Sequence, residues 1–391
     1  MRIRQGFTII RLLALLSVIM LSLCIAPTLT LHGQLTRAPF FASRNSSQTI
    51  LTNNASRFTI LNSITIALES EGIAVDTLNH NIFVTVDGGF FVINGSDDKV
   101  IYGAFIYGNP VLSGIAYDPV NNLMYAASRA PGGLLMINAT TFKLVGNISV
   151  GGAYDVVYDP AAGHLFVSIW SSNLVKVVDP RTNNVISNIS VAPEPLEMAY
   201  VSKNGNIYVV DSQTSQLTVI NTSTNNVVDN IAVGNSPYGV AYNPTKGVLY
   251  VSNRNSENIS IVSVNSEAVI SNITTRGYSP QGLLYDQGNG LLFVTAISSH
   301  GSILIFDKNN TLMQNLAVGS LPSWIAADPY NGQIYASGKF TDQLYVIGIP
   351  NPAQSHPIPP LLLYLIIGSV AASTFILVAV LLIRKQGHKY G

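Results

Sequence analysis

Two acidic side chains are the strongest candidates for chemistry in this chain of 391 residues. Asp155 and Glu197 hold the same place in consecutive copies of a repeated segment, four residues before a turn. If the two copies are neighbours in space, the carboxylates lie side by side. They then either share a divalent cation or raise one another's pKa. We predict a cation or polar-ligand site at these two residues, and the alternative is a pair of acids that are simply solvated.

Five larger side chains extend this candidate site. Trp324 stands where most copies of the repeat have glycine, and the other four share a loop position: Arg129, Trp170, Arg254 and Lys339. Large aromatic residues and arginines are enriched in recognition hot spots, and an exposed tryptophan also suits stacking on a sugar. We therefore predict a ligand-binding face, although either tryptophan could equally fill a gap in the core.

These residues are positioned by a repeat whose turn recurs at intervals of about 42 residues, and four short strands per unit of this length are typical of a β-propeller blade. The sequence predicts an all-β protein, a seven-bladed β-propeller of four-stranded repeats over residues 58–349. We interpret the acidic residues at these turns as structural residues of the hairpins and not as catalysts, because Asp-Pro and Asn-Pro favour turns. The seven turn residues are Asp76, Asp118, Asp159, Val201, Asn243, Asp286 and Asp328.

The ring is predicted to close through its N-terminal strand. The last copy of the repeat ends after its third strand, and residues 58–66 match residues 142–150, the fourth strand of an earlier copy. Pairing the two ends would remove an exposed sheet edge. In this arrangement the loops entering the first strands, and those joining the second and third strands, lie on one face at the mouth of the channel.

The two ends of the chain predict export and anchoring. Residues 1–33 have a basic start and an apolar stretch, which indicates a signal peptide or signal anchor. Residues 34–57 are predicted to be a flexible lead-in, and the proline-rich residues 350–360 an extended stalk. Residues 361–383 carry no charge and suffice for a membrane-spanning helix of ~20 residues. The basic tail 384–391 places the cytoplasm at that end and the propeller outside the cell.

Composition excludes some partners and favours others. The formal net charge is zero and only 10% of residues are charged, so no nucleic-acid partner is expected. The single cysteine, Cys24, lies within the predicted signal, which excludes a disulfide framework in a processed chain. Asn-x-Ser/Thr sequons recur at one place on the predicted perimeter strand. We predict glycosylation there, at Asn147, Asn188 and Asn272.

The best copies of the repeat resemble a known type. The segment Leu249-Tyr250-Val251-Ser252-Asn253, followed by Asn258-Ile259-Ser260-Ile261-Val262, resembles the YVTN-type β-propeller repeat. Such repeats are similar to those of archaeal surface-layer proteins and of bacterial cell-surface or periplasmic proteins. The resemblance implies a fold and a location more than a chemistry, because one fold hosts many functions.

Together these observations predict a non-enzymatic, membrane-anchored protein that acts as a binding or scaffold propeller at the cell surface. Cell-surface proteins or glycans would be its partners. The sequence holds no Gly-x-Ser-x-Gly motif, phosphate loop or paired-histidine motif, and we expect no catalytic residues and no cofactor beyond the cation. The alternative is an anchored propeller enzyme, a lactonase-like hydrolase or quinone-dependent dehydrogenase, with Asp155 and Glu197 at the channel mouth.

Overall fold

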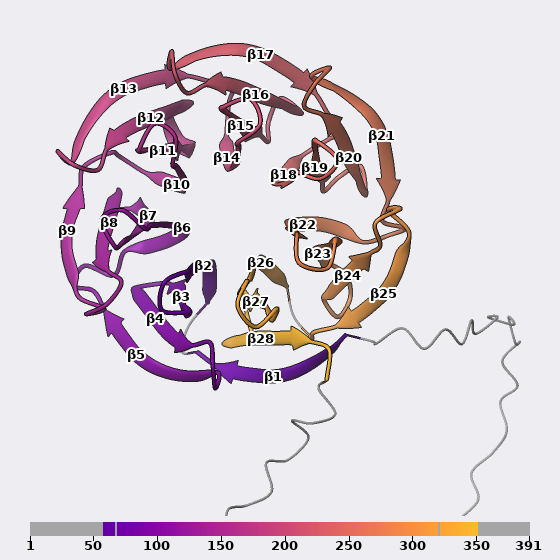
Figure 1. Ribbon diagram of the computed structural model, residues 1–391, viewed down its shortest axis with the longest axis horizontal. Helices are drawn as coiled ribbons and strands as arrows, with labels where there is room; N and C mark the ends of the chain where they lie inside the picture. The colour runs from indigo at the N-terminus through magenta and orange to yellow at the C-terminus, as the bar shows by residue number, and fades with distance from the viewer. Residues whose placement is uncertain (1–57, 67–68, 320, 351–391) are drawn as a thin grey trace, which may run out of the picture. The chain divides into compact units, whose positions relative to one another are not determined.

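The computed structural model describes residues 58–66, 69–319 and 321–350. These residues form seven four-stranded antiparallel sheets arranged as blades around a central channel (Figure 1). The predicted seven-bladed propeller is therefore confirmed. Within the described ranges no helix is long and apolar enough to cross a bilayer. The predicted signal, lead-in, membrane span and tail lie outside those ranges, as does the predicted stalk except for Pro350.

The first four blades follow one another along the chain. Blade 1 contains β2 (Ser70–Asp76), β3 (Asn81–Val86), β4 (Gly89–Asn94) and β5 (Lys99–Phe105). Blade 2 contains β6 (Val111–Asp118), β7 (Leu123–Ala130), β8 (Gly133–Asn138) and β9 (Leu144–Ile148). Blade 3 contains β10 (Ala153–Asp159), β11 (His164–Ile169), β12 (Leu174–Asp179) and β13 (Asn184–Ser190). Blade 4 contains β14 (Pro195–Val201), β15 (Asn206–Asp211), β16 (Gln216–Asn221) and β17 (Asn226–Ala232).

The last three blades complete the ring. Blade 5 contains β18 (Pro237–Asn243), β19 (Val248–Asn253), β20 (Asn258–Ser263) and β21 (Ala268–Thr274). Blade 6 contains β22 (Ser279–Asp286), β23 (Leu291–Ile297), β24 (Ser302–Phe306) and β25 (Leu312–Ala317). Blade 7 contains β26 (Pro322–Ala327), β27 (Ile334–Gly338), β28 (Gln343–Gly348) and, from the other end of the propeller, β1 (Thr59–Thr65).

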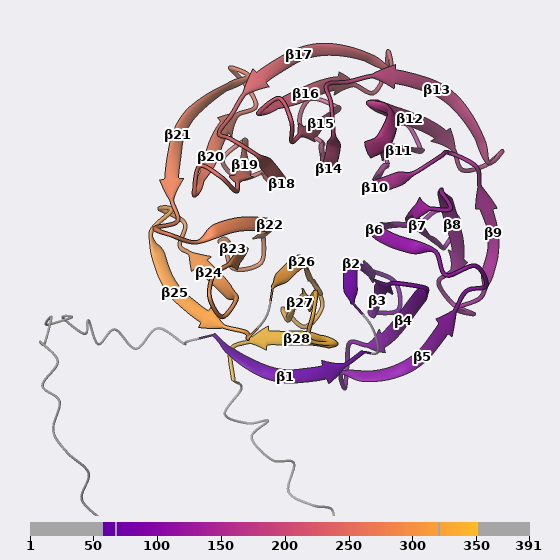
Figure 2. The same ribbon diagram turned by 180° about the vertical axis from the view of Figure 1, so that it is seen from behind.

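The ring closes through β1, as predicted. This strand pairs antiparallel with β28, and both views show it lying outside β28 on the perimeter (Figures 1 and 2). Ile64 pairs with Leu344, just as Ile148 pairs with Leu134 in blade 2. The sequence match between residues 58–66 and 142–150 therefore identified the correct register.

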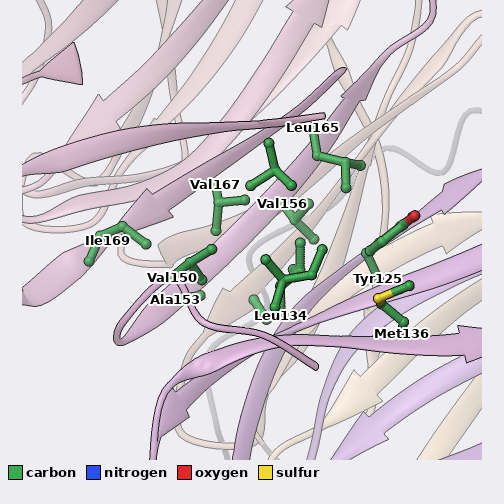
Figure 3. Packing of buried hydrophobic residues seen from close by; sticks show 12 residues of the cluster. Tyr125, Leu134, Met136, Val150, Ala153, Val156, Leu165, Val167 and Ile169 are labelled. Atoms are coloured by element: carbon green, nitrogen blue, oxygen red, sulfur yellow. The ribbon is translucent and has the colours of Figure 1, made fainter. Parts of the chain in front are cut away.

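The core lies between neighbouring blades. Figure 3 shows one such cluster, in which Tyr125 and Leu134 of blade 2 pack with Leu165 and Val167 of blade 3. A second-strand aromatic residue occurs at the same position in every blade and is at most 2% exposed. These residues are Phe83, Tyr125, Phe166, Tyr208, Tyr250, Phe293 and Tyr335. Aromatic side chains pack well on a pleated, buried strand and bury a large apolar area, which explains why the second strand of each blade carries one at this position.

Two faces of the propeller are distinguished by their loops. The turns between the first and second strands define the turn face. There the carboxylate of Asp118 accepts a hydrogen bond from the backbone N–H of Val120 at 2.9 Å, and Asp159 does the same for Ala161 at 2.8 Å. Such turns satisfy backbone donors, so these acids are structural. The opposite side, the loop face, holds the loops that enter the first strands and those that join the second and third strands. Backbone bonds such as Arg254 N–H to the Ser236 carbonyl, at 2.9 Å, join the two kinds of loop.

Blades 1, 3, 5 and 6 are each joined to the following blade near the loop face by a hydroxyl of the second strand. Thr85 and Thr295 each donate a hydrogen bond of 2.7 Å to a first-strand carbonyl of the following blade, and Ser168 donates a similar bond of 2.8 Å. In blade 5, Ser252 donates to the carbonyl of Gln281 and accepts from the N–H of Gly239 at 2.8 Å. This is the role of the Ser or Thr that stands two residues after the buried aromatic residue in these four blades, and the sequence alone did not reveal it.

Replacing the blade-5 hydroxyl tests this joint. We expect Ser252→Ala to lower the free energy of unfolding by ~1–3 kcal/mol, because two buried backbone groups lose their partner. Urea denaturation of the purified chain measures the change. Ser271→Ala, on the exposed perimeter strand of the same blade, is the matched control and should change stability by less than about 0.5 kcal/mol. Equal effects in both variants would show that the joint contributes nothing specific.

Candidate functional site

A β-bulge near the loop face shapes the site. In every blade the register between the first and second strands breaks, for example between Pro237 and Val240 in blade 5. A bulge bends the strand and turns side chains away from the regular pleat. In six blades two consecutive residues lie in the break, and we call these places the first and second bulge positions. In blade 3 only Tyr154 lies in the break, because Asp155 at the second position pairs with Ser168. The second is the position that the sequence singled out.

The side chains at the first bulge position fill the end of the channel. All seven are at most 8% exposed: Glu71, Ser113, Tyr154, Leu196, Tyr238, Gln281 and Ser323. The hydroxyl of Tyr154 donates a 2.7 Å hydrogen bond to that of Tyr238, although β10 and β18 belong to blades separated by blade 4. Trp324 of blade 7 approaches from across the ring, with its ring centroid 6.4 Å from that of Tyr154. Tyr154, Leu196, Tyr238 and Trp324 form one cluster, which we call the channel plug.

The predicted carboxylates, Asp155 and Glu197, are buried beside the channel plug. Asp155 is 4% exposed and Glu197 is 7% exposed, so neither is solvated. Asp155 Oδ2 accepts a 2.9 Å hydrogen bond from the N–H of Met198 in the next blade. Burial raises the pKa of Asp155 to about 7. It also raises the pKa of Glu197 well above its ordinary value, with a further contribution from the charge of Asp155.

Glu197 retains unused hydrogen-bonding capacity. Its Oε1 atom is buried and has no hydrogen-bond partner among the described residues. Across the same ranges, no group of three or more histidine, cysteine or acidic side chains could hold a metal ion. The predicted cation site at Asp155 and Glu197 would therefore have to draw its remaining ligands from backbone oxygens or water, and it stays a prediction.

A third acid, which the sequence comparison missed, joins two of the predicted cations. Glu71, at the first bulge position of blade 1, is 3% exposed. Its Oε1 atom lies 2.6 Å from Nζ of Lys339 in blade 7 and 3.5 Å from Nη2 of Arg129 in blade 2. Three neighbouring blades thus meet at one carboxylate. Two cations against one acid leave a positive surplus at this side of the plug.

Arg254 lies on the other side of the plug. Its guanidinium carbon is 3.9 Å from the centroid of the Tyr238 ring, which is close enough for a cation–π contact. Its Nη2 atom donates a 2.5 Å hydrogen bond to Oε1 of Gln281 in blade 6. Arg254 is therefore a partly structural residue that locks one tyrosine of the plug in place.

The two tryptophans have different environments. Trp324 packs in the plug, and its buried Nε1 atom has no hydrogen-bond partner within the described part of the chain. Trp170 begins the short 3-10 helix η1 (Trp170–Ser172) between β11 and β12 and is 46% exposed. Trp170 and Arg129 line the same pocket of about 310 Å³ on the loop face. Of the sequence-predicted set, the structure thus brings Arg129 to both Lys339 and Trp170, and it places Trp324 among the tyrosines.

One signal could have found the missed residues. The column of the repeat one residue before Asp155 and Glu197 contains Glu71, Tyr154 and Tyr238. Polar and aromatic side chains there depart from the alternation of a regular strand, which is how a bulge shows in a sequence. Strand alternation by itself does not single out this column, because it separates only every second residue.

The predicted glycosylation sites are accessible. Asn147 on β9, Asn188 on β13 and Asn272 on β21 are exposed and lie on the perimeter strands of blades 2, 3 and 5. Figure 1 shows these strands on the outside of the ring, away from the channel. A glycan at any of them would leave the loop face free.

Comparison with known proteins extends the repeat assignment without naming a chemistry. No curated protein matches the chain. Residues 109–282 match the model of a family described as a repeat of unknown function, DUF6923. The match includes β6 to β21, the whole of blades 2 to 5, and the first residues of β22. This chain is thus a β-propeller repeat protein similar over four blades to that repeat family.

Proposed function

We propose that this protein is a membrane-anchored, outward-facing propeller that binds partners at the cell surface without catalysing a reaction, in the manner of a surface-layer scaffold. The observation that carries the binding role is the closed loop face. The Tyr154–Tyr238 hydrogen bond across the channel gives a ligand a floor of side chains. Arg129 and Lys339 meet at one edge of that floor, and Arg254 lies at the other.

Sequence features support the anchored location. Residues 361–383 are apolar and are followed by basic residues, a pattern that keeps the following tail in the cytoplasm. The resemblance of the repeat to the YVTN type, shared with surface-layer and cell-surface proteins, agrees with export. Exposed sequons at Asn147, Asn188 and Asn272 suit a glycoprotein.

One observation favours the alternative, an anchored propeller enzyme. Buried acids with raised pKa values cluster at catalytic sites, and Asp155 and Glu197 form such a pair. A lactonase-like hydrolase would use them to hold a cation, and a quinone-dependent dehydrogenase would place its cofactor against them. Both roles need the pair to be reached from the loop face, whereas both carboxylates are buried.

Labelling of intact cells tests the proposed location. Cells that display the full chain are treated with a membrane-impermeant amine reagent, and the propeller is analysed for modified lysines such as the exposed Lys143 and Lys203. We expect labelling of the propeller before lysis. Deletion of residues 361–391 should release the protein into the medium. Labelling that requires lysis would overturn an outward-facing propeller.

A further inference from the structure

A pocket between blades 2 and 3 is lined by Arg129, whose charge is only partly neutralised, and by the exposed ring of Trp170. It measures about 310 Å³, which is the lower end of the range for small-molecule sites. Its lining consists of Val111, Arg129, Ala130, Gly152, Trp170 and Ser171. The channel plug does not contribute to it, so the pocket can be filled without opening the channel.

The positive charge and the N–H donors of Arg129 are only partly paired within the described residues. Its guanidinium makes one long contact, 3.5 Å, with Glu71, while Lys339 is already 2.6 Å from the same carboxylate oxygen. The Nε atom of Arg129 is buried and has no hydrogen-bond partner in the described part of the protein. A guanidinium binds a carboxylate through paired N–H donors, so a carboxylate in the pocket would supply acceptors that the long contact with Glu71 does not.

Glycines form the loops beside the pocket, and Gly152 is part of its lining. Gly132 and Gly151 have positive φ angles of 100° and 89°, and a Cβ atom added to Gly132 would lie 2.8 Å from the carbonyl carbon of Gly151. The two loops therefore meet backbone to backbone. A Cβ atom added to Gly152, which lines the pocket, would lie 3.0 Å from the carbonyl oxygen of Arg129 and 3.4 Å from Oγ of Ser171, so glycine leaves this part of the wall free of a side chain. The hydroxyl of Ser171 adds a polar group at the rim.

We propose that this pocket binds a carboxylated sugar ring, a uronic acid residue of a glycan. The apolar face of a pyranose stacks on Trp170, its carboxylate pairs with Arg129, and Ser171 is placed for a ring hydroxyl. A neutral sugar would leave the guanidinium unused, and a small anion would leave the tryptophan unused. This assignment rests on the proposed role of the loop face as a binding surface, and it specifies the ligand class.

Calorimetric titration of the full chain in detergent tests the assignment, with methyl β-D-glucuronide as the probe. We expect saturable binding, with a dissociation constant at least tenfold lower than those of methyl β-D-glucoside, acetate and benzoate. Arg129→Met and Trp170→Leu should each weaken binding at least tenfold. The controls are Phe340→Leu, an exposed aromatic residue of the loop joining β27 and β28, and Arg181→Met on the turn face. Both controls should stay within twofold of the unchanged chain.

The chain offers an optical check on the site, because Trp170 and Trp324 are its only tryptophans. In a Trp324→Phe chain, emission from Trp170 alone should change as glucuronide is added. Thermal melting of each variant separates lost binding from lost folding, and Arg129→Lys, which keeps the charge, should retain part of the affinity if Arg129→Met proves unstable.

Several results would overturn the proposal. Glucoside or benzoate binding as tightly as glucuronide would refute a carboxylated sugar, and unchanged affinity in folded Arg129→Met and Trp170→Leu chains would refute this pocket. A chain that is labelled on intact cells but binds no glucuronide would sink the uronate assignment while keeping the surface propeller. If a chain that is labelled only after lysis binds glucuronide, the uronate assignment stands and the outward-facing propeller is refuted.

Discussion

Deletion of residues 58–66 is expected to abolish cooperative unfolding and to leave an aggregating chain. These residues supply β1, the fourth strand of blade 7. Ile64 and Ile66 belong to the core cluster that contains Leu344, and Phe58 packs edge to face on Phe293 at 5.2 Å. Removing them exposes both that core and the unpaired edge of β28, and an exposed edge is a template for pairing with other chains.

Thermal melting and light scattering of the full-length and deleted chains measure this effect. Deletion of the nine preceding residues, 49–57, is a control of equal length and should leave the transition in place. Adding a peptide of residues 58–66 should restore part of the cooperativity by pairing with β28. An unchanged melting transition in the deleted chain would mean that three strands suffice for blade 7.

Neutralising the buried acid pair is expected to stabilise the protein increasingly as pH rises. The folded state holds the proton of Asp155 up to a pKa of about 7, whereas an unfolded chain releases it near 3.8. Because the folded state binds more protons between these values, its stability falls as pH increases through that window. The pKa of Glu197 is raised in the same direction. At about 1.4 kcal/mol per pKa unit, Asp155 alone costs up to ~4 kcal/mol at pH 8.

Asp155→Asn combined with Glu197→Gln removes this cost, and the asparagine oxygen can still accept the bond from Met198. We expect the double variant to match the unchanged chain near pH 4 and to exceed it by about 2 kcal/mol or more at pH 8, as measured by urea denaturation at both values. Asp179→Asn is the control. Its side chain is only 12% exposed, but its hydrogen bonds with Arg181 lower its pKa, so that substitution should give no gain at high pH.

The same comparison decides the cation hypothesis. If Ca²⁺, Mg²⁺ or Zn²⁺ binds between Asp155 and Glu197, millimolar amounts of that ion will stabilise the unchanged chain at pH 8 and have no effect on the double variant. Stabilisation by the ion would reopen the enzyme alternative. Equal stability of both chains at pH 8 without any ion would contradict the sign of the predicted pH dependence.

The candidate site was only partly readable from the sequence. Comparing the blades at equivalent positions identified Arg129, Trp170 and Lys339, because a loop residue that departs from its repeat is visible in the alignment of copies. It missed Glu71, which joins two of them. A contact between blades 1, 2 and 7 depends on how the ends of the ring meet, and no spacing within a single copy encodes it.

The sequence by itself determined the architecture of the propeller. The turn recurs at a regular period, each copy has one buried aromatic residue, and residues 58–66 provide the fourth strand that the last copy lacks. A closed seven-bladed ring is the arrangement that gives every blade four strands. Only the tertiary structure decided what happens at the channel. Bulges turn Tyr154 and Tyr238 toward each other across the ring, and the resulting plug buries Asp155 and Glu197. The burial of a side chain depends on residues from distant blades that fill the space around it, whereas the period of the strands depends on neighbours along the chain. The sequence therefore predicted the fold of the propeller but not the burial of Asp155 and Glu197.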